Sequence, residues 1–116
     1  MSETGKDYSS DILSRLFEVI ESRKGTGGET SYTAKLLAGG KPKIARKVGE
    51  EAMEVLTATL AEGRGEVIAE SADLLYHLLV LWVAEDIQPA EVWAELAGRE
   101  GISGIEEKRS RSSNAL

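Results

Sequence analysis

The sequence predicts an all-α protein built on two long antiparallel helices. Apolar residues recur every three or four positions along most of the 116 residues, a spacing typical of helices and not of strands. Proline, which breaks helices, occurs only twice. The two longest periodic segments are joined by a short connection, residues 62–65, so they are expected to pack antiparallel as a helical hairpin.

The first two helices are predicted over residues 11–23 and from Ser31 to Leu37. In the first, four apolar residues fall on one face at i, i+3, i+4 and i+7: Leu13, Leu16, Phe17 and Ile20. Three glycines follow this helix and favour a loop. The Ser31 side chain is expected to cap the second helix, and Gly39 and Gly40 to end it.

The hairpin consists of helices predicted over residues 43–62 and 66–85. Pro42 suits the first turn of the earlier helix. Apolar side chains form a stripe along that helix: Ile44, Val48 and Ala52. Gly63 and Gly65 interrupt the helical pattern between the two segments. Side chains on the facing sides of the hairpin are therefore expected to meet.

The rest of the chain adds short helices to a single domain, residues 1–116, because the length fits one domain and not two. Pro89 lies near the start of a helix that runs to about Gly98, and a weaker pattern predicts a last short helix over residues 104–109. The two ends, residues 1–8 and 112–116, are small and polar, and we expect them to be flexible.

One part of the second hairpin helix, residues 74–83, is apolar on nearly every side. A helix of this kind has to be covered all round, and a domain of this size has too few helices to do so. We therefore expect a homodimer in which dimerisation completes a four-helix bundle core.

The composition argues against several functions. With 14 basic and 20 acidic residues the net charge is −6, which disfavours binding to nucleic acid or to an anionic membrane. The longest apolar run, residues 78–84, is far shorter than the roughly 20 residues that span a bilayer. Cysteine is absent, which excludes disulfides and thiolate sites and fits a cytoplasmic protein.

Two acidic pairs lie on the predicted hairpin. Glu51 and Glu54 are three residues apart and share a helix face, as do Glu70 and Asp73 on the next helix. The pairs lie at similar heights above the turn, so antiparallel packing brings them together. Facing carboxylates repel unless a cation lies between them, and oxygen ligands favour Mg²⁺, with Mn²⁺ as a substitute. His77, one turn further along, is a candidate to support this site.

Such a site suits the hydrolysis of a phosphate anhydride by metal-bound water. Glu50 is a candidate general base, or a residue that orders a basic neighbour. Lys43 and Lys47 lie within two turns of the acidic pair and are candidates to bind phosphate. The three hydroxyl residues after the glycine loop are further candidates for phosphate binding, or else serve as a helix cap and in packing: Ser31, Tyr32 and Thr33.

The acidic pattern resembles a known signature. EEAME at 50–54 followed by ESAD at 70–73 is similar to the EExxE…ExxD pattern of the all-α nucleoside-triphosphate pyrophosphohydrolases, the MazG-like superfamily. Within that superfamily the chain looks most like the phosphoribosyl-ATP pyrophosphatase family. The strings that carry this closer resemblance are SYT at 31–33, KVGEE at 47–51, ADLLYH at 72–77, and SGIEEK at 103–108 with Arg111.

The resemblance implies a Mg²⁺-dependent cytoplasmic enzyme that converts the small-molecule nucleotide phosphoribosyl-ATP to phosphoribosyl-AMP and pyrophosphate, the second step of histidine biosynthesis. From the length and the absence of cysteine we expect it to be a stand-alone enzyme. The resemblance also implies a set of metal ligands, namely Glu51, Glu54, Glu70 and Asp73, and it makes Glu50 a weaker candidate for activating water. Substrate-binding roles at the C-terminal end, for Glu107, Lys108 and Arg111, rest on the resemblance alone.

Two alternatives remain open at this point. One is a MazG-like house-cleaning pyrophosphatase that acts on a noncanonical dNTP. The other is a non-catalytic helical dimerisation module, because acidic residues on a helix are usually part of a solvated face.

Overall fold

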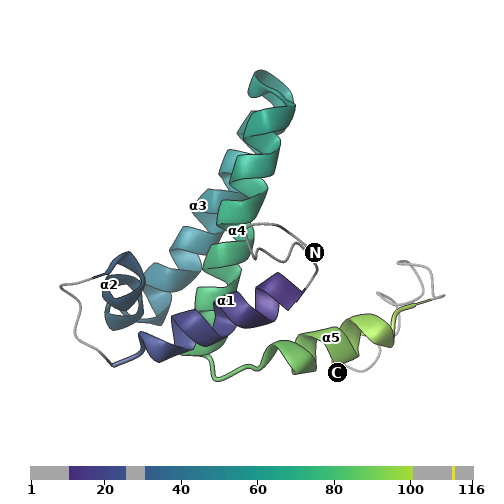
Figure 1. The fold of residues 1–116 in the computed structure, drawn as a ribbon. Helices are drawn as coiled ribbons and strands as arrows, with labels where there is room; N and C mark the ends of the chain where they lie inside the picture. The colour runs from purple at the N-terminus through teal and green to yellow at the C-terminus, as the bar shows by residue number, and fades with distance from the viewer. Residues whose placement is uncertain (1–10, 26–30, 101–110, 112–116) are drawn as a thin grey trace, which may run out of the picture.

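The computed structural model describes residues 11–25, 31–100 and 111. The part of the chain it describes contains helices and turns and no strand, which confirms the predicted all-α class (Figure 1). The elements in order are α1 (Asp11–Ser22), α2 (Tyr32–Ala38), α3 (Lys41–Thr57), the π-helical turn η1 (Ala58–Glu62), α4 (Arg64–Ala84) and α5 (Pro89–Ala97). The predicted last helix and the ends expected to be flexible, residues 104–109, 1–8 and 112–116, lie outside the described residues.

The long hairpin stands out of a small hydrophobic core. Helix α3 with η1 and helix α4 run side by side in opposite directions, and α1 and α2 pack against the end of this hairpin that is far from its turn (Figure 1). The core joins residues from four helices: Phe17, Ile20, Leu36, Ile44, Leu79, Val80 and Val83. The hairpin turn projects beyond this core, so the middle of the hairpin is held mainly by the two helices themselves.

The junction between α2 and α3 depends on one glycine. Gly39 ends α2 in a right-handed conformation with φ −75°, so the left-handed C-terminal role predicted for a glycine there does not fall on it. Gly40 has φ 91° and ψ 164°, a region almost restricted to glycine, and α3 begins directly after it at Lys41. Helix α3 therefore starts two residues earlier than predicted, with Pro42 in its first turn.

The hairpin turn is tighter than the sequence suggests. Gly63 alone interrupts the helices, in an extended conformation with φ 175°, and Gly65 is already helical in α4. Before the turn, the regular helix ends at Thr57 and continues as the π-helical η1. Within η1 the Thr59 hydroxyl donates to the Val55 carbonyl at 2.8 Å, a side-chain bond that accompanies distortion of helices.

Much apolar surface on the hairpin faces outward. Leu60 at the turn is 78% exposed, and other large apolar side chains on α3 and α4 are also exposed: Met53, Leu56, Ile68 and Leu75. Among the described residues, α4 is the one helix long and apolar enough to cross a membrane by length and composition, a test that core helices of soluble proteins also pass. Glu70 and Asp73 lie in the middle of that helix, where a bilayer would disfavour them.

Candidate functional site

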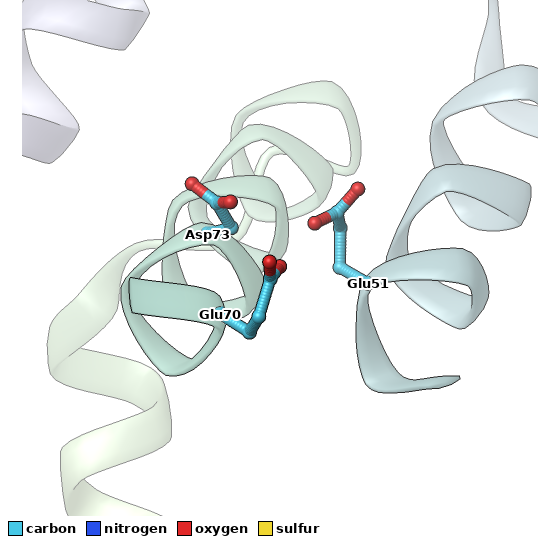
Figure 2. Close-up of side chains that lie close together, drawn as sticks. All are labelled: Glu51, Glu70 and Asp73. Atoms are coloured by element: carbon cyan, nitrogen blue, oxygen red, sulfur yellow. The ribbon is translucent and has the colours of Figure 1, made fainter. Parts of the chain in front are cut away.

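Three carboxylates meet between the two arms of the hairpin. Glu51 comes from α3, and Glu70 and Asp73 come from successive turns of α4; the Glu51 and Glu70 side chains lie between the two helices, and Asp73 lies on α4 at the edge of that space (Figure 2). One oxygen of each carboxylate lies within 4.8 Å of the others. The side chain of Glu51 is only 13% exposed, Glu70 is half-buried and Asp73 is exposed, so the cluster lies at the surface of the hairpin with Glu51 as its shielded member.

The cluster is electrostatically strained without a cation. Partial burial raises the pKa of the Glu70 carboxyl above its usual value, and the neighbouring carboxylates raise it further, with Asp73 first, then Glu54 and Glu51. Like charges packed this way disfavour the ionised form, and a positive charge placed among them reverses the effect. The site therefore favours a bound cation.

The donor set fits a small divalent metal ion. Three atoms no more than 4.8 Å apart share a point about 2.8 Å from each of them, and Mg²⁺–oxygen distances are about 2.1 Å, so small side-chain rotations close the difference. All the donors are carboxylate oxygens, the ligands that Mg²⁺ and Mn²⁺ prefer.

The fourth predicted ligand, Glu54, lies apart from this cluster. Its side chain is exposed, and its carboxylate is not among the three that converge. It remains near enough to Glu70 to contribute to the raised pKa of that carboxyl. The structure thus brings three of the four predicted acidic residues together and places Glu54 at the edge of the site.

Lys47 brings a positive charge to the cluster. Its Nζ lies 3.5 Å from an oxygen of Glu50 and 3.7 Å from an oxygen of Glu51. The phenolic oxygen of Tyr32 is the largest influence that raises the pKa of Lys47; burial lowers it, and Glu50 and Glu51 raise it further. The ammonium is therefore held in the charged form. Glu50 forms an ion pair with this lysine, and Lys43 is exposed one turn earlier on α3.

The hydroxyls of the SYT segment are engaged within the fold. Ser31 Oγ accepts from the Ala34 N–H at 2.9 Å, which makes Ser31 the N-cap of α2 as predicted. The Thr33 hydroxyl is hydrogen-bonded to the Tyr76 hydroxyl, and the Tyr32 hydroxyl to Nε2 of His77. These bonds dock α2 on α4, so the structure shows structural partners for all three hydroxyls.

Sequence reasoning missed Tyr76 and the pairing of Tyr32 with His77. These residues are 45 positions apart, and no local spacing indicates that they meet. Of the C-terminal candidates, Glu107 and Lys108 lie outside the described residues, and Arg111 is an exposed residue in helical conformation.

An all-α hairpin with converging carboxylates is consistent with the MazG-like class of nucleotide pyrophosphohydrolases. Comparison with known protein families gives a more specific assignment within that class. The family model described as phosphoribosyl-ATP pyrophosphohydrolase matches residues 13–100. The chain belongs to this family.

Curated relatives support the same placement. A phosphoribosyl-ATP pyrophosphatase of Paramagnetospirillum magneticum is 60% identical over 103 residues, which cover 89% of this chain and 94% of the relative. Proteins of the same name from Azospirillum brasilense and Parvibaculum lavamentivorans are 51% and 57% identical, over 90% and 85% of this chain and 95% and 91% of their own lengths.

Proposed function

We propose that this chain is a Mg²⁺-dependent phosphoribosyl-ATP pyrophosphatase, which hydrolyses phosphoribosyl-ATP to phosphoribosyl-AMP and pyrophosphate in the cytoplasm, a step of histidine biosynthesis. The identity of the substrate is supported by the names of the relatives, whose sequences are up to 60% identical to this chain over most of its length. The observation that carries the chemistry is the convergence of three carboxylate oxygens within 4.8 Å.

Different residues of the hairpin have different roles in this proposal. Glu51, Glu70 and Asp73 would hold the divalent ion, with Glu54 near the same edge. When bound, such an ion neutralises phosphate charge and makes a water more acidic. Lys47 offers its ammonium to the phosphate oxygens. Glu50, exposed beside Lys47, would hold that ammonium or accept a proton from the attacking water.

The test is release of pyrophosphate from phosphoribosyl-ATP by the purified protein with Mg²⁺, compared with a panel of canonical and noncanonical dNTPs. We expect turnover of phosphoribosyl-ATP to exceed that of every dNTP and to fall at least about 100-fold in Asp73→Asn. Preferred hydrolysis of a dNTP would favour the house-cleaning reaction. Absence of any hydrolysis, with Asp73→Asn unchanged in its Mn²⁺ affinity, would favour a non-catalytic dimerisation module.

We also propose that the working form is a homodimer and that neither a membrane nor nucleic acid is a partner. The exposed apolar residues of the hairpin support this, because Met53, Leu56 and Leu60 recur on one side of α3 and η1. A second hairpin would cover them and complete a four-helix bundle without placing Glu70 and Asp73 in lipid. Sedimentation equilibrium of the wild type should give twice the mass of the chain. The Leu56→Glu variant should give the mass of a single chain. A wild-type monomer, or binding to anionic vesicles, would contradict the proposal.

A further inference from the structure

Lys47 forms ion pairs with two carboxylates that belong to different parts of the site. Its Nζ lies 3.7 Å from an oxygen of Glu51, which is one of the three clustered residues, and 3.5 Å from an oxygen of Glu50, which is outside the cluster. The exposed fraction of the side chain rises from 13% at Glu51 through 31% at Lys47 to 53% at Glu50. The lysine therefore joins the shielded carboxylate of the cluster to an exposed one.

In the metal-free protein, the Lys47 ammonium offsets part of the negative charge of the cluster. It is paired with Glu51, whose side chain lies between the two helices with that of Glu70 (Figure 2). A divalent ion held by Glu51 would lie close to this ammonium and repel it, because like charges a few ångströms apart repel even in water. A lysine–carboxylate pair that is partly open to solvent contributes little stability. The repulsion therefore outweighs the attraction between Lys47 and Glu51.

We propose that Lys47 is an internal counter-ion of Glu51 that a divalent ion displaces, and that the displaced ammonium binds the phosphates of the nucleotide. Glu50 keeps the lysine at the site during this exchange, because the pair between Lys47 and Glu50 lies outside the metal-binding cluster. Lys47 thus couples metal binding to phosphate binding. The inference rests on the proposed function and deepens it, since it states when the phosphate-binding cation becomes available.

Removing the Lys47 ammonium should have two effects of opposite sign. It removes a competitor for Glu51, so a divalent ion alone should bind more tightly. It also removes a charged hydrogen-bond donor to phosphate, so metal-dependent binding of pyrophosphate should weaken. A lysine that only stabilises α3 through its pairs along the helix would not give opposite effects. A lysine that binds phosphate without competing for Glu51 would leave metal binding unchanged.

The experiment compares wild type, Lys47→Met and a matched control, Lys41→Met. Methionine keeps an unbranched stem and removes the charge. Lys41 lies earlier on α3 and forms an ion pair with Glu85 at 3.2 Å, so Lys41→Met removes the same charge and a similar pair away from the cluster. Two affinities are measured at low ionic strength: that for Mn²⁺ alone, by electron paramagnetic resonance, and that for inorganic pyrophosphate at saturating Mg²⁺, by calorimetry.

In Lys47→Met we expect Mn²⁺ to bind about three- to tenfold more tightly, the effect of one charge near a divalent ion at a protein surface. Pyrophosphate should bind about tenfold more weakly, the effect of one lost hydrogen bond to a charged group. Lys41→Met should leave both affinities within about twofold of wild type.

Three results would overturn the proposal: Mn²⁺ binding that is unchanged or weaker in Lys47→Met, pyrophosphate binding that is absent in wild type or unchanged in Lys47→Met, and a gain in Mn²⁺ affinity in Lys41→Met equal to that in Lys47→Met. If wild type binds pyrophosphate but does not hydrolyse phosphoribosyl-ATP, the proposed function fails, while the two affinities still decide the role of Lys47.

Discussion

Replacing Glu51 by Gln should weaken Mn²⁺ binding by more than about 100-fold, whereas the same change at Glu54 should weaken it only about fivefold. Glu51 contributes one of the three oxygens that lie within 4.8 Å of each other, and loss of a charged ligand exceeds the roughly 10- to 100-fold effect of removing groups that merely support ligands. Glu54 lies outside that set. A carboxylate that lies near a divalent ion at a protein surface without contacting it contributes on the order of 1 kcal/mol, equivalent to about fivefold in affinity.

The assay is a Mn²⁺ titration followed by the electron paramagnetic resonance signal of the free ion. Glu66→Gln is the matched control. Glu66 is an exposed residue in the first turn of α4, outside the three-carboxylate cluster, so this substitution removes the same charge without removing a ligand. Equal losses of affinity in Glu51→Gln and Glu54→Gln would refute the three-carboxylate site. So would a loss in Glu66→Gln as large as that in Glu51→Gln, since binding would then follow total charge and not geometry.

Three further outcomes follow from the fold and the site. The pKa of Glu70 is raised in the folded protein, so protonation of this carboxyl stabilises the metal-free fold. This stabilisation is complete below the ordinary carboxyl pKa of 4.5 and is lost as the pH rises through the raised pKa. In thermal melts, acidification should therefore raise the melting temperature of the wild type by an increment that Glu70→Gln lacks. Gly40→Ala should lower the free energy of unfolding by about 1–3 kcal/mol, because Gly40 has a positive φ. Gly49→Ala should raise the free energy of unfolding by about 0.5–1 kcal/mol, because Gly49 is helical with open space at its Cβ position. Urea titration measures both, and a change of the same sign in the two variants would contradict the backbone argument. Leu79→Ala, at a side chain that is 1% exposed, should cost about 2–5 kcal/mol in the same titration, and a loss below 1 kcal/mol would mean that the core extends elsewhere.

The fold was predictable because its signals are local. Helical periodicity and the short connection before residue 66 predict the hairpin, and a serine at position 31 predicts the cap of α2. The errors are at places where glycine has more than one role. Gly65 was expected to break the chain and is helical, because Gly63 alone makes the turn. The π-helical η1 has no signal in composition, since it depends on how the helix meets its partner.

The candidate site was predictable only in part, for a physical reason. Glu51, Glu70 and Asp73 come together because i, i+3 spacing and antiparallel packing fix their faces and heights. Glu54 has the same spacing signal, but its side chain is exposed outside the cluster, and which side of α3 faces α4 depends on tertiary packing that the sequence does not fix. The contact of Tyr32 with His77 depends on tertiary packing of α2, and neither residue alone indicates the other.

The π-helical turn has a consequence for insertions and deletions near the tip. Adding or removing one residue in a regular helical hairpin rotates everything after it by about 100°, which would carry Glu70 and Asp73 away from Glu51. A π-helical turn holds one residue more than an α-helical turn of the same path, so deleting one residue of η1 lets the helix become regular while both arms keep their register. Deletion of one residue within 58–62 should therefore be tolerated. An insertion or deletion of one residue between η1 and Asp73 should disrupt the carboxylate cluster.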